Sequence, residues 1–250
     1  MKYIILPIAI GLTTILSSYT TETLKTYDYN DISISTSYVD AETEIRKVSS
    51  FEKLNVSSAI TVQVVDGNST GEIKVNAPKE AMSKIKTKVV NGVLNIYIEG
   101  RLTLNNQKII LEFPHQKLRD VSISGASSVT INHKMKIDKF NANVSGASKL
   151  KANLLTNDAD IEISGSSAVT LTGNVSDLDV EATGASKFDG ENLKANTANV
   201  EASGASKIKV WAVSNLDVEA SGASKVEYIN QKGLNPKIQK SGVSKVNAIS

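Results

Sequence analysis

Residues 203–207 read Ser-Gly-Ala-Ser-Lys, and seven variants of this pentapeptide recur between residues 124 and 245. Successive glycines of the pentapeptides are 18 to 21 residues apart. The seven glycines are Gly125, Gly146, Gly165, Gly184, Gly204, Gly222 and Gly242. Recurrence at so regular a spacing indicates a repeat protein, in which each repeat is one structural unit.

Apolar and polar residues alternate on both sides of each glycine. In the repeat at Gly204, Val200 and Ala202 precede the glycine at alternate positions, and Ile208 follows it. A period of two is typical of strands. Each repeat is therefore predicted to consist of a strand, a bend at the glycine, a second strand and a short connector such as residues 174–176.

A two-strand unit of this size cannot bury its own apolar face, but stacking gives each strand a neighbour above and below. The sequence thus predicts an all-β fold, a single-stranded right-handed parallel β-helix (β-solenoid) with coils of about 18–21 residues. We expect positive φ angles at the glycines. A serine follows two residues after every glycine, and we expect these serine hydroxyls to bond to one another along the stack.

The repeats are preceded by three further segments, Phe51–Val56, Val93–Ile96 and Phe113-Pro114. Together with the repeats, they resemble the auto-transporter adhesin family with a head GIN domain. The resemblance covers roughly residues 48–248. It implies an extracytoplasmic single-stranded β-helix from a Gram-negative bacterium, and it carries no catalytic residues over to this chain.

The segment 1–20 is typical of a secretory signal peptide, with Lys2 before an apolar run over residues 4–16 and small polar residues after it. That run is shorter than the roughly 20 residues of a membrane-spanning helix. We predict a signal peptide over 1–20, a flexible leader over 21–47 and a β-helix domain over 48–250. Within that domain we expect irregular N-terminal coils over 48–118 and regular repeats over 119–250. The chain is expected in the periplasm, on the outer-membrane surface or outside the cell, without a transmembrane segment after processing.

Composition excludes several classes of function. The chain has 28 Lys and Arg against 26 Asp and Glu, so it lacks the positive excess of a general nucleic-acid binder. It has no cysteine, which excludes disulfides, thiolate metal sites, a cysteine nucleophile and a lipoprotein cysteine. We predict no cofactor.

Charged side chains also repeat with the coil. Acidic residues occupy the positions three and five before the glycine, which alternation places on one outer face. They are Asp160, Glu162, Asp179, Glu181, Glu201, Asp217 and Glu219. Lysines recur three residues after the glycine, at Lys187, Lys207 and Lys225 among others. The two sets are the predicted binding surface, for a surface glycan or an envelope protein; the alternative is a solvated face without a ligand.

The preferred interpretation is a non-catalytic adhesion, binding or scaffold module. One alternative is a carbohydrate-active β-helix, a polysaccharide lyase or hydrolase that uses the acidic residues. Another is calcium binding by the same strip. The spacing of His115 and His133 is close to one coil, so they could stack, but two histidines without a third ligand do not define a zinc site. We therefore predict no metal and expect both histidines to be exposed connector residues. Trp211 is predicted to be a packing or rim residue and not a platform for a sugar ring.

Overall fold

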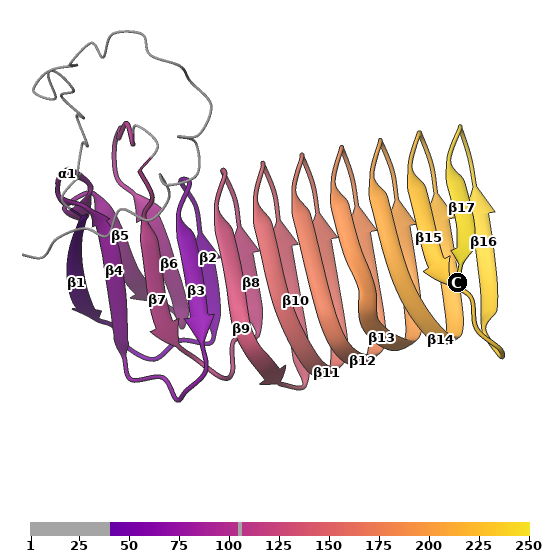
Figure 1. Cartoon of the computed structure of the whole chain (residues 1–250), viewed down its shortest axis with the longest axis horizontal. Helices are drawn as coiled ribbons and strands as arrows, with labels where there is room; N and C mark the ends of the chain where they lie inside the picture. Colours follow the sequence, from indigo (N-terminus) through magenta and orange to yellow (C-terminus); the bar gives the residue numbers. More distant parts are fainter. Residues whose placement is uncertain (1–40, 105–106) are drawn as a thin grey trace, which may run out of the picture. The chain divides into compact units, whose positions relative to one another are not determined.

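The computed structural model describes residues 41–104 and 107–250, and these residues form a 17-stranded sheet wound into a solenoid (Figure 1). The predicted all-β solenoid is confirmed. The predicted signal peptide and the first part of the predicted leader, up to residue 40, lie outside the described residues. Within the described ranges, no helix has the length and hydropathy needed to cross a membrane.

The regular coils stack in parallel and in register. Their strands are β8 (Asp120–Ile123), β9 (Ser128–Lys136), β10 (Lys139–Val144), β11 (Lys149–Ile163), β12 (Ala168–Ala182), β13 (Lys187–Ala202), β14 (Lys207–Ala220), β15 (Lys225–Ile229), β16 (Asn235–Lys240) and β17 (Lys245–Ile249). Val180 pairs with Val200 of the next coil, and Val200 pairs with Val218 of the one after. All three are buried, so the alternating apolar residues form continuous columns inside the solenoid.

The predicted short connectors are themselves strand. Residues 174–176 lie inside β12, where Asn174 pairs with Lys194 and Val175 with Ala195. The strands β11 to β14 each run from one bend to the next. Stacking explains this difference, because each connector finds backbone partners in the neighbouring coil even where its own sequence does not alternate.

The bends require glycine. Gly204 has a φ of 69°, and a Cβ atom there would lie 2.7 Å from the carbonyl oxygen of Gly184. That oxygen accepts a hydrogen bond from the N–H of Ala205 at 2.8 Å. The bends of neighbouring coils are therefore in direct backbone contact, with no room for a side chain at the glycine position.

The serines after the bends are buried, except for the half-buried Ser244, but they do not form the predicted hydroxyl ladder. Ser224 Oγ donates to the carbonyl of Ala202 at 3.3 Å, and among the described residues no two serines of this column are joined hydroxyl to hydroxyl. The hydroxyls of Ser148, Ser186 and Ser206 have no partner. The reason is spacing, because equivalent atoms of stacked coils are about 4.8 Å apart and an O–H···O bond needs about 2.8 Å.

The N-terminal end is a cap with a different chain order. Its elements are β1 (Ala41–Lys47), β2 (Lys53–Val56), β3 (Thr61–Val65), β4 (Glu72–Pro78), α1 (Lys79–Met82), β5 (Ile85–Val90), β6 (Val93–Ile98) and β7 (Ile110–Pro114). The β2–β3 coil pairs with β8 and β9 on one side and with β6 and β7 on the other. Segments later in the sequence thus lie outside the first coil. Antiparallel strands β4, β5 and β1 complete the cap.

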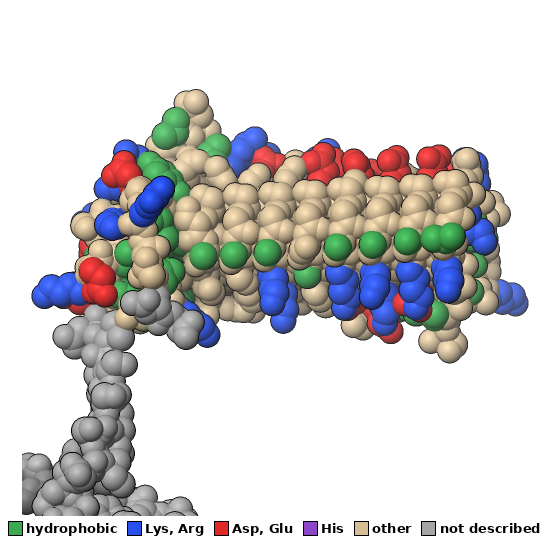
Figure 2. Space-filling model, turned by 90° about the horizontal axis from the view of Figure 1, so that it is seen from above, with side chains coloured by type: hydrophobic (Ala, Val, Ile, Leu, Met, Phe, Trp, Pro, Cys, Tyr) green, Lys and Arg blue, Asp and Glu red, His purple; other side chains and the backbone are tan. Residues whose placement is uncertain are grey.

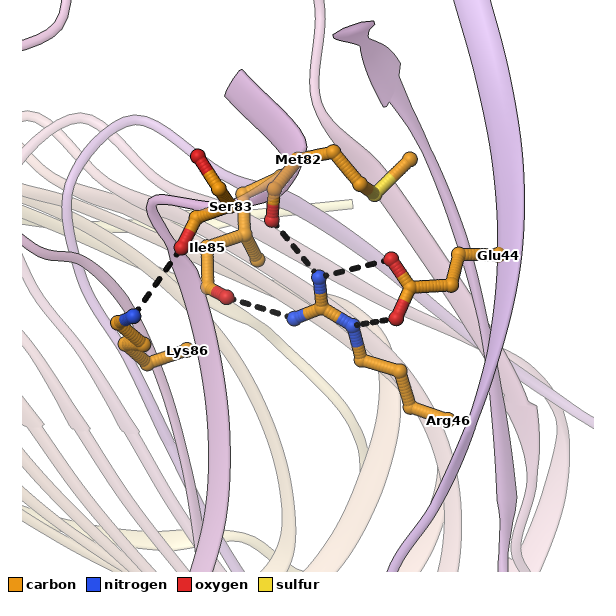
Figure 3. A network of polar contacts seen from close by, with 6 residues as sticks. All are labelled: Glu44, Arg46, Met82, Ser83, Ile85 and Lys86. Carbon is orange, nitrogen blue, oxygen red and sulfur yellow. Dashed lines mark hydrogen bonds and ion pairs between the residues drawn. The ribbon is translucent and has the colours of Figure 1, made fainter. Parts of the chain in front are cut away.

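Residues 41–47, which the sequence places in the leader, form β1. Every residue of this strand except Arg46 is exposed, and the strand is held by backbone pairing with β4 and by Arg46. The guanidinium of Arg46 donates to the carbonyls of Ile85 at 2.6 Å and Met82 at 2.8 Å, and it also binds Glu44 (Figure 3). β1 has no buried apolar alternation, so its sequence lacks the usual signal of a strand.

Candidate binding surface

The predicted acidic residues are brought together on one face of the regular coils. Glu162, Glu181, Glu201 and Glu219 are register partners in four consecutive coils, and we call them the Glu column. Asp160, Asp179 and Asp217 form a parallel Asp column two residues earlier, with Asn199 in the remaining coil. Because strand residues two apart point to the same side, both columns face outward together.

The Glu column has amide neighbours at its ends and carboxylates in its middle. Asn143 Nδ2 donates to Glu162 Oε2 at 2.6 Å, and Gln239 Nε2 donates to Glu219 Oε1 at 3.4 Å. Among the described residues, no lysine or arginine forms an ion pair with any of the four glutamates. All four are exposed, so their carboxylates are available to a ligand.

The Asp column, in contrast, contains one ion pair. Asn199 Nδ2 donates to Asp179 Oδ1 at 2.7 Å, and Lys237 Nζ lies 2.8 Å from Asp217 Oδ2. The hydrogen bond to Asp217 raises the pKa of Lys237 above its ordinary value. Asp217 therefore has a cationic partner, whereas none of the four glutamates has one among the described residues.

The lysine column lies beyond the bends. Lys187, Lys207 and Lys225 are register partners, and Figure 2 shows acidic side chains along one side of the row of bends and lysines along the other. Lys187 pairs with Asp189 at 3.4 Å, and Lys225 pairs with Glu227 at 2.6 Å. Acidic residues on the same strands thus neutralise part of this column, which makes it the weaker candidate.

Two further acidic residues lie on this face, although they are not part of the predicted binding surface. Asp158 and Asp177 are register partners seven residues before their glycines, and both are exposed. One further step of the period-two alternation, from five to seven residues before the glycine, would have placed them beside the Asp column.

A shallow hollow runs beside the Glu column. Its volume is about 300 Å³, and its lining includes Glu181, Glu201 and Glu219 together with the hydroxyl residues Thr183, Ser203 and Ser221. The hydroxyl residues directly precede the bend glycines. Carboxylates and hydroxyls of successive coils therefore line one open groove, which offers acceptors and donors at regular intervals.

The histidines do not form a metal site. His115 is buried, its Nε2 lies 2.8 Å from the carbonyl oxygen of Phe51, and its Nδ1 accepts the N–H of Lys117 at 3.1 Å. Both ring nitrogens are engaged, so neither is free to ligate an ion. Nowhere in residues 41–104 and 107–250 do three or more His, Asp or Glu side chains cluster closely enough to hold a metal.

Trp211 is half-buried against its own chain. Its Nε1 donates to Gln231 Oε1 at 2.9 Å, and Lys194 Nζ lies 5.6 Å from the ring centroid. The ring thus packs against its own chain, as predicted, and its polar atom is satisfied.

The profile of a family described as "Putative auto-transporter adhesin, head GIN domain" matches residues 50–231. The chain belongs to this adhesin family. The match extends over both the cap and the acidic face, and it confirms the family resemblance seen in the repeats. No curated protein sequence matches the chain at a significant level.

Solved structures show the same fold. A "putative adhesin" from Bacteroides fragilis superposes with a TM-score of 0.77 at 18% identity, covering 84% of this chain and 97% of that one. A "putative adhesin" from Parabacteroides distasonis gives 0.65 at 17% identity, covering 83% and 97%. A "putative lipid binding protein" from the same species gives 0.59 at 18% identity, covering 84% and 97%. At these identities the likeness is one of fold.

Proposed function

We propose that this chain is an exported, non-catalytic binding module, and that its Glu column binds a surface glycan rich in hydroxyl or amino donors. The observation that carries the proposal is the alignment of four exposed carboxylates in consecutive coils without a cationic partner among the described residues. Membership of an adhesin family supports a binding role. The signal-like segment 1–20 supports export.

The chemistry of the groove suits a glycan. Carboxylates accept hydrogen bonds from sugar hydroxyls and attract amino groups, and Thr183 and Ser203 can donate or accept beside them. The coils repeat these groups about every 4.8 Å. An extended polymer can contact several coils at once, so weak contacts at each coil add to a useful affinity through effective concentration.

The same carboxylates would serve a carbohydrate-active enzyme, so the test must separate binding from cleavage. The chain is incubated with a panel of acidic, neutral and amino-bearing polysaccharides, and both retention and chain length of the polysaccharide are measured. We expect retention of at least one polymer without shortening. Specific bond cleavage abolished by Glu181→Gln with Glu201→Gln would contradict the non-catalytic assignment.

The double variant Glu181→Gln with Glu201→Gln keeps the side-chain size and removes two charges from the centre of the Glu column. We expect its glycan affinity to fall at least tenfold. The matched control, Lys187→Gln with Lys207→Gln, changes two charges across the bends and should bind normally. Equal losses in both variants would contradict binding at the Glu column. Titration calorimetry with calcium on the same variants tests the calcium alternative.

A further inference from the structure

The two ends of the solenoid carry different residues on their open strand edges. At the C-terminal end, β16 pairs only with β14 among the described residues. The N–H of Ser241 donates to Ala220, so by alternation Pro236 directs its nitrogen to the open side. Proline removes one donor from that edge, and Lys240 places a charge in a column that is otherwise apolar. The β16 edge is therefore protected against strand addition, whereas β17, which pairs only with β15 among the described residues, has no proline on its open edge.

The N-terminal edge has no proline, and its charged residues are of both signs. Within the described part of the chain, β1 pairs only with β4, and it lies at the opposite end of the solenoid from β17 (Figure 1). The N–H of Val48 donates to Gly71 at 2.8 Å, which shows that the even-numbered residues of β1 face β4. Thr43 and Ile45 accordingly direct their backbone groups to the open side, and neither is proline.

Ile45 adds an apolar contact to this edge. Its side chain is 55% exposed, although isoleucine is usually buried. It lies on the outer face of β1, opposite Lys74 of β4. An open edge with an exposed β-branched residue is a template for pairing with another strand.

We propose that β1 pairs antiparallel with β1 of a second copy of this chain, so that two solenoids join through their N-terminal caps. The charges of β1 favour a second copy of β1 as the pairing strand, and they also favour one register of the pair. When the two-fold axis passes through Ile45, the two Ile45 side chains are opposite each other, and Glu44 of each copy faces Arg46 of the other. An axis at Thr43 would place Glu42 opposite Glu44, and an axis at Glu44 would place two glutamates together.

This register is self-complementary, as an isologous two-fold interface requires. Opposite charges directly across an antiparallel pair are favourable, and like charges are unfavourable. Arg46 is already positioned by the carbonyls of Met82 and Ile85 and by Glu44 of its own copy, so pairing would place two Glu44–Arg46 ion pairs side by side with little further ordering. The proposal does not depend on the glycan-binding role, because the Glu column belongs to the regular coils.

The absence of cysteine makes a direct test simple. Ile45→Cys introduces one thiol at the proposed axis, where the Cα atoms of an antiparallel hydrogen-bonded pair are about 5.5 Å apart, within the range of a disulfide. The control is Val243→Cys, which is 74% exposed at the opposite end. The chain is produced with its native N-terminus, and disulfide formation is followed under mild oxidation. We expect Ile45→Cys to cross-link at least tenfold faster than Val243→Cys.

Sedimentation velocity over a concentration series gives the second measurement. The unmodified chain should show a monomer–dimer equilibrium, and Ile45→Lys should shift it to monomer without changing the circular dichroism spectrum. Thr43→Pro should do the same, whereas Ile238→Lys at the opposite end should not. A monomer at every concentration, with equal cross-linking of the two cysteine variants, would overturn the proposal. So would a dimer that Ile45→Lys leaves intact, or an Ile45→Cys thiol that a soluble maleimide cannot reach in a monomer.

Discussion

The carbonyl oxygen of Gly125 lies 2.5 Å from the position that a Cβ atom on Gly146 would occupy. Gly146 also has a φ of 76°, which L side chains rarely adopt. We predict that Gly146→Ala lowers the free energy of unfolding by about 2 to 5 kcal/mol, from backbone strain and from overlap with the preceding coil. Chemical denaturation measures this loss.

Gly92→Ala is the matched control for that substitution. Gly92 has a φ of 74°, but nothing lies within 4 Å of a Cβ atom placed there. The variant should lose only about 1 to 2 kcal/mol, since strain is its sole cost. Equal losses at the two glycines would show that coil contact does not constrain the bends.

Removal of the unpaired hydroxyl of Ser206 should change the free energy of unfolding in the opposite direction. It is buried without a hydrogen-bond partner, and a buried unsatisfied group costs about 1 to 3 kcal/mol. We predict that Ser206→Ala raises the free energy of unfolding by about 1 kcal/mol. Ser224→Ala should instead lower it by about 0.5 to 1.5 kcal/mol, because Ser224 donates to Ala202. Destabilisation by both variants would mean that Ser206 is satisfied after all.

The regular coils could be predicted from sequence because each repeat contains the same pattern of apolar and polar residues. Val200 and Ala202 alternate with polar residues before a glycine, and their neighbours do the same in every coil, so strand, bend and stacking follow from local rules. The cap could not be derived this way. The placement of β6 outside β2 depends on pairing between Leu54 and Leu94, which are far apart in the chain, and nothing in the local sequence specifies it.

The candidate site, too, could be predicted from the sequence only in part. The Glu column follows from register, so alternation alone places Glu181 and Glu201 correctly on one face. The interactions of individual side chains are less accessible. The sequence predicts exposed connector residues at both histidines, yet His133 lies half-buried in β9 and His115 is buried beside Phe51, with ring centroids 4.7 Å apart. Its environment comes from residues 64 positions away, which alternation cannot reveal.

His115 should make stability depend on pH. Burial lowers the pKa of its imidazole below 6.5, and its Nδ1 must stay unprotonated to accept the Lys117 N–H. The unfolded chain therefore binds the proton more readily. Stability is full above about pH 6.5 and falls as pH drops from there through the folded-state pKa.

The measurement is the free energy of unfolding between pH 7 and pH 5, a window above most carboxylate pKa values. His115→Gln keeps a donor and an acceptor but does not titrate, so its curve should be flatter than that of the unmodified chain. If the free energy of unfolding had the same slope against pH in both proteins, the pH dependence would come from groups other than His115.

Arg46 should hold the cap together while leaving the coils untouched. Its guanidinium joins β1 to the carbonyls of Met82 and Ile85, and it is 15% exposed, so these charge-assisted bonds are largely shielded from water. Arg46→Ala should cost about 2 to 3 kcal/mol of local stability. Hydrogen exchange should therefore accelerate in β1 and at the start of β5 but not in β13. Arg46→Lys should recover only part of the protection, since an ammonium cannot reproduce the planar fork. Uniform acceleration along the whole solenoid would show instead that cap and coils unfold together.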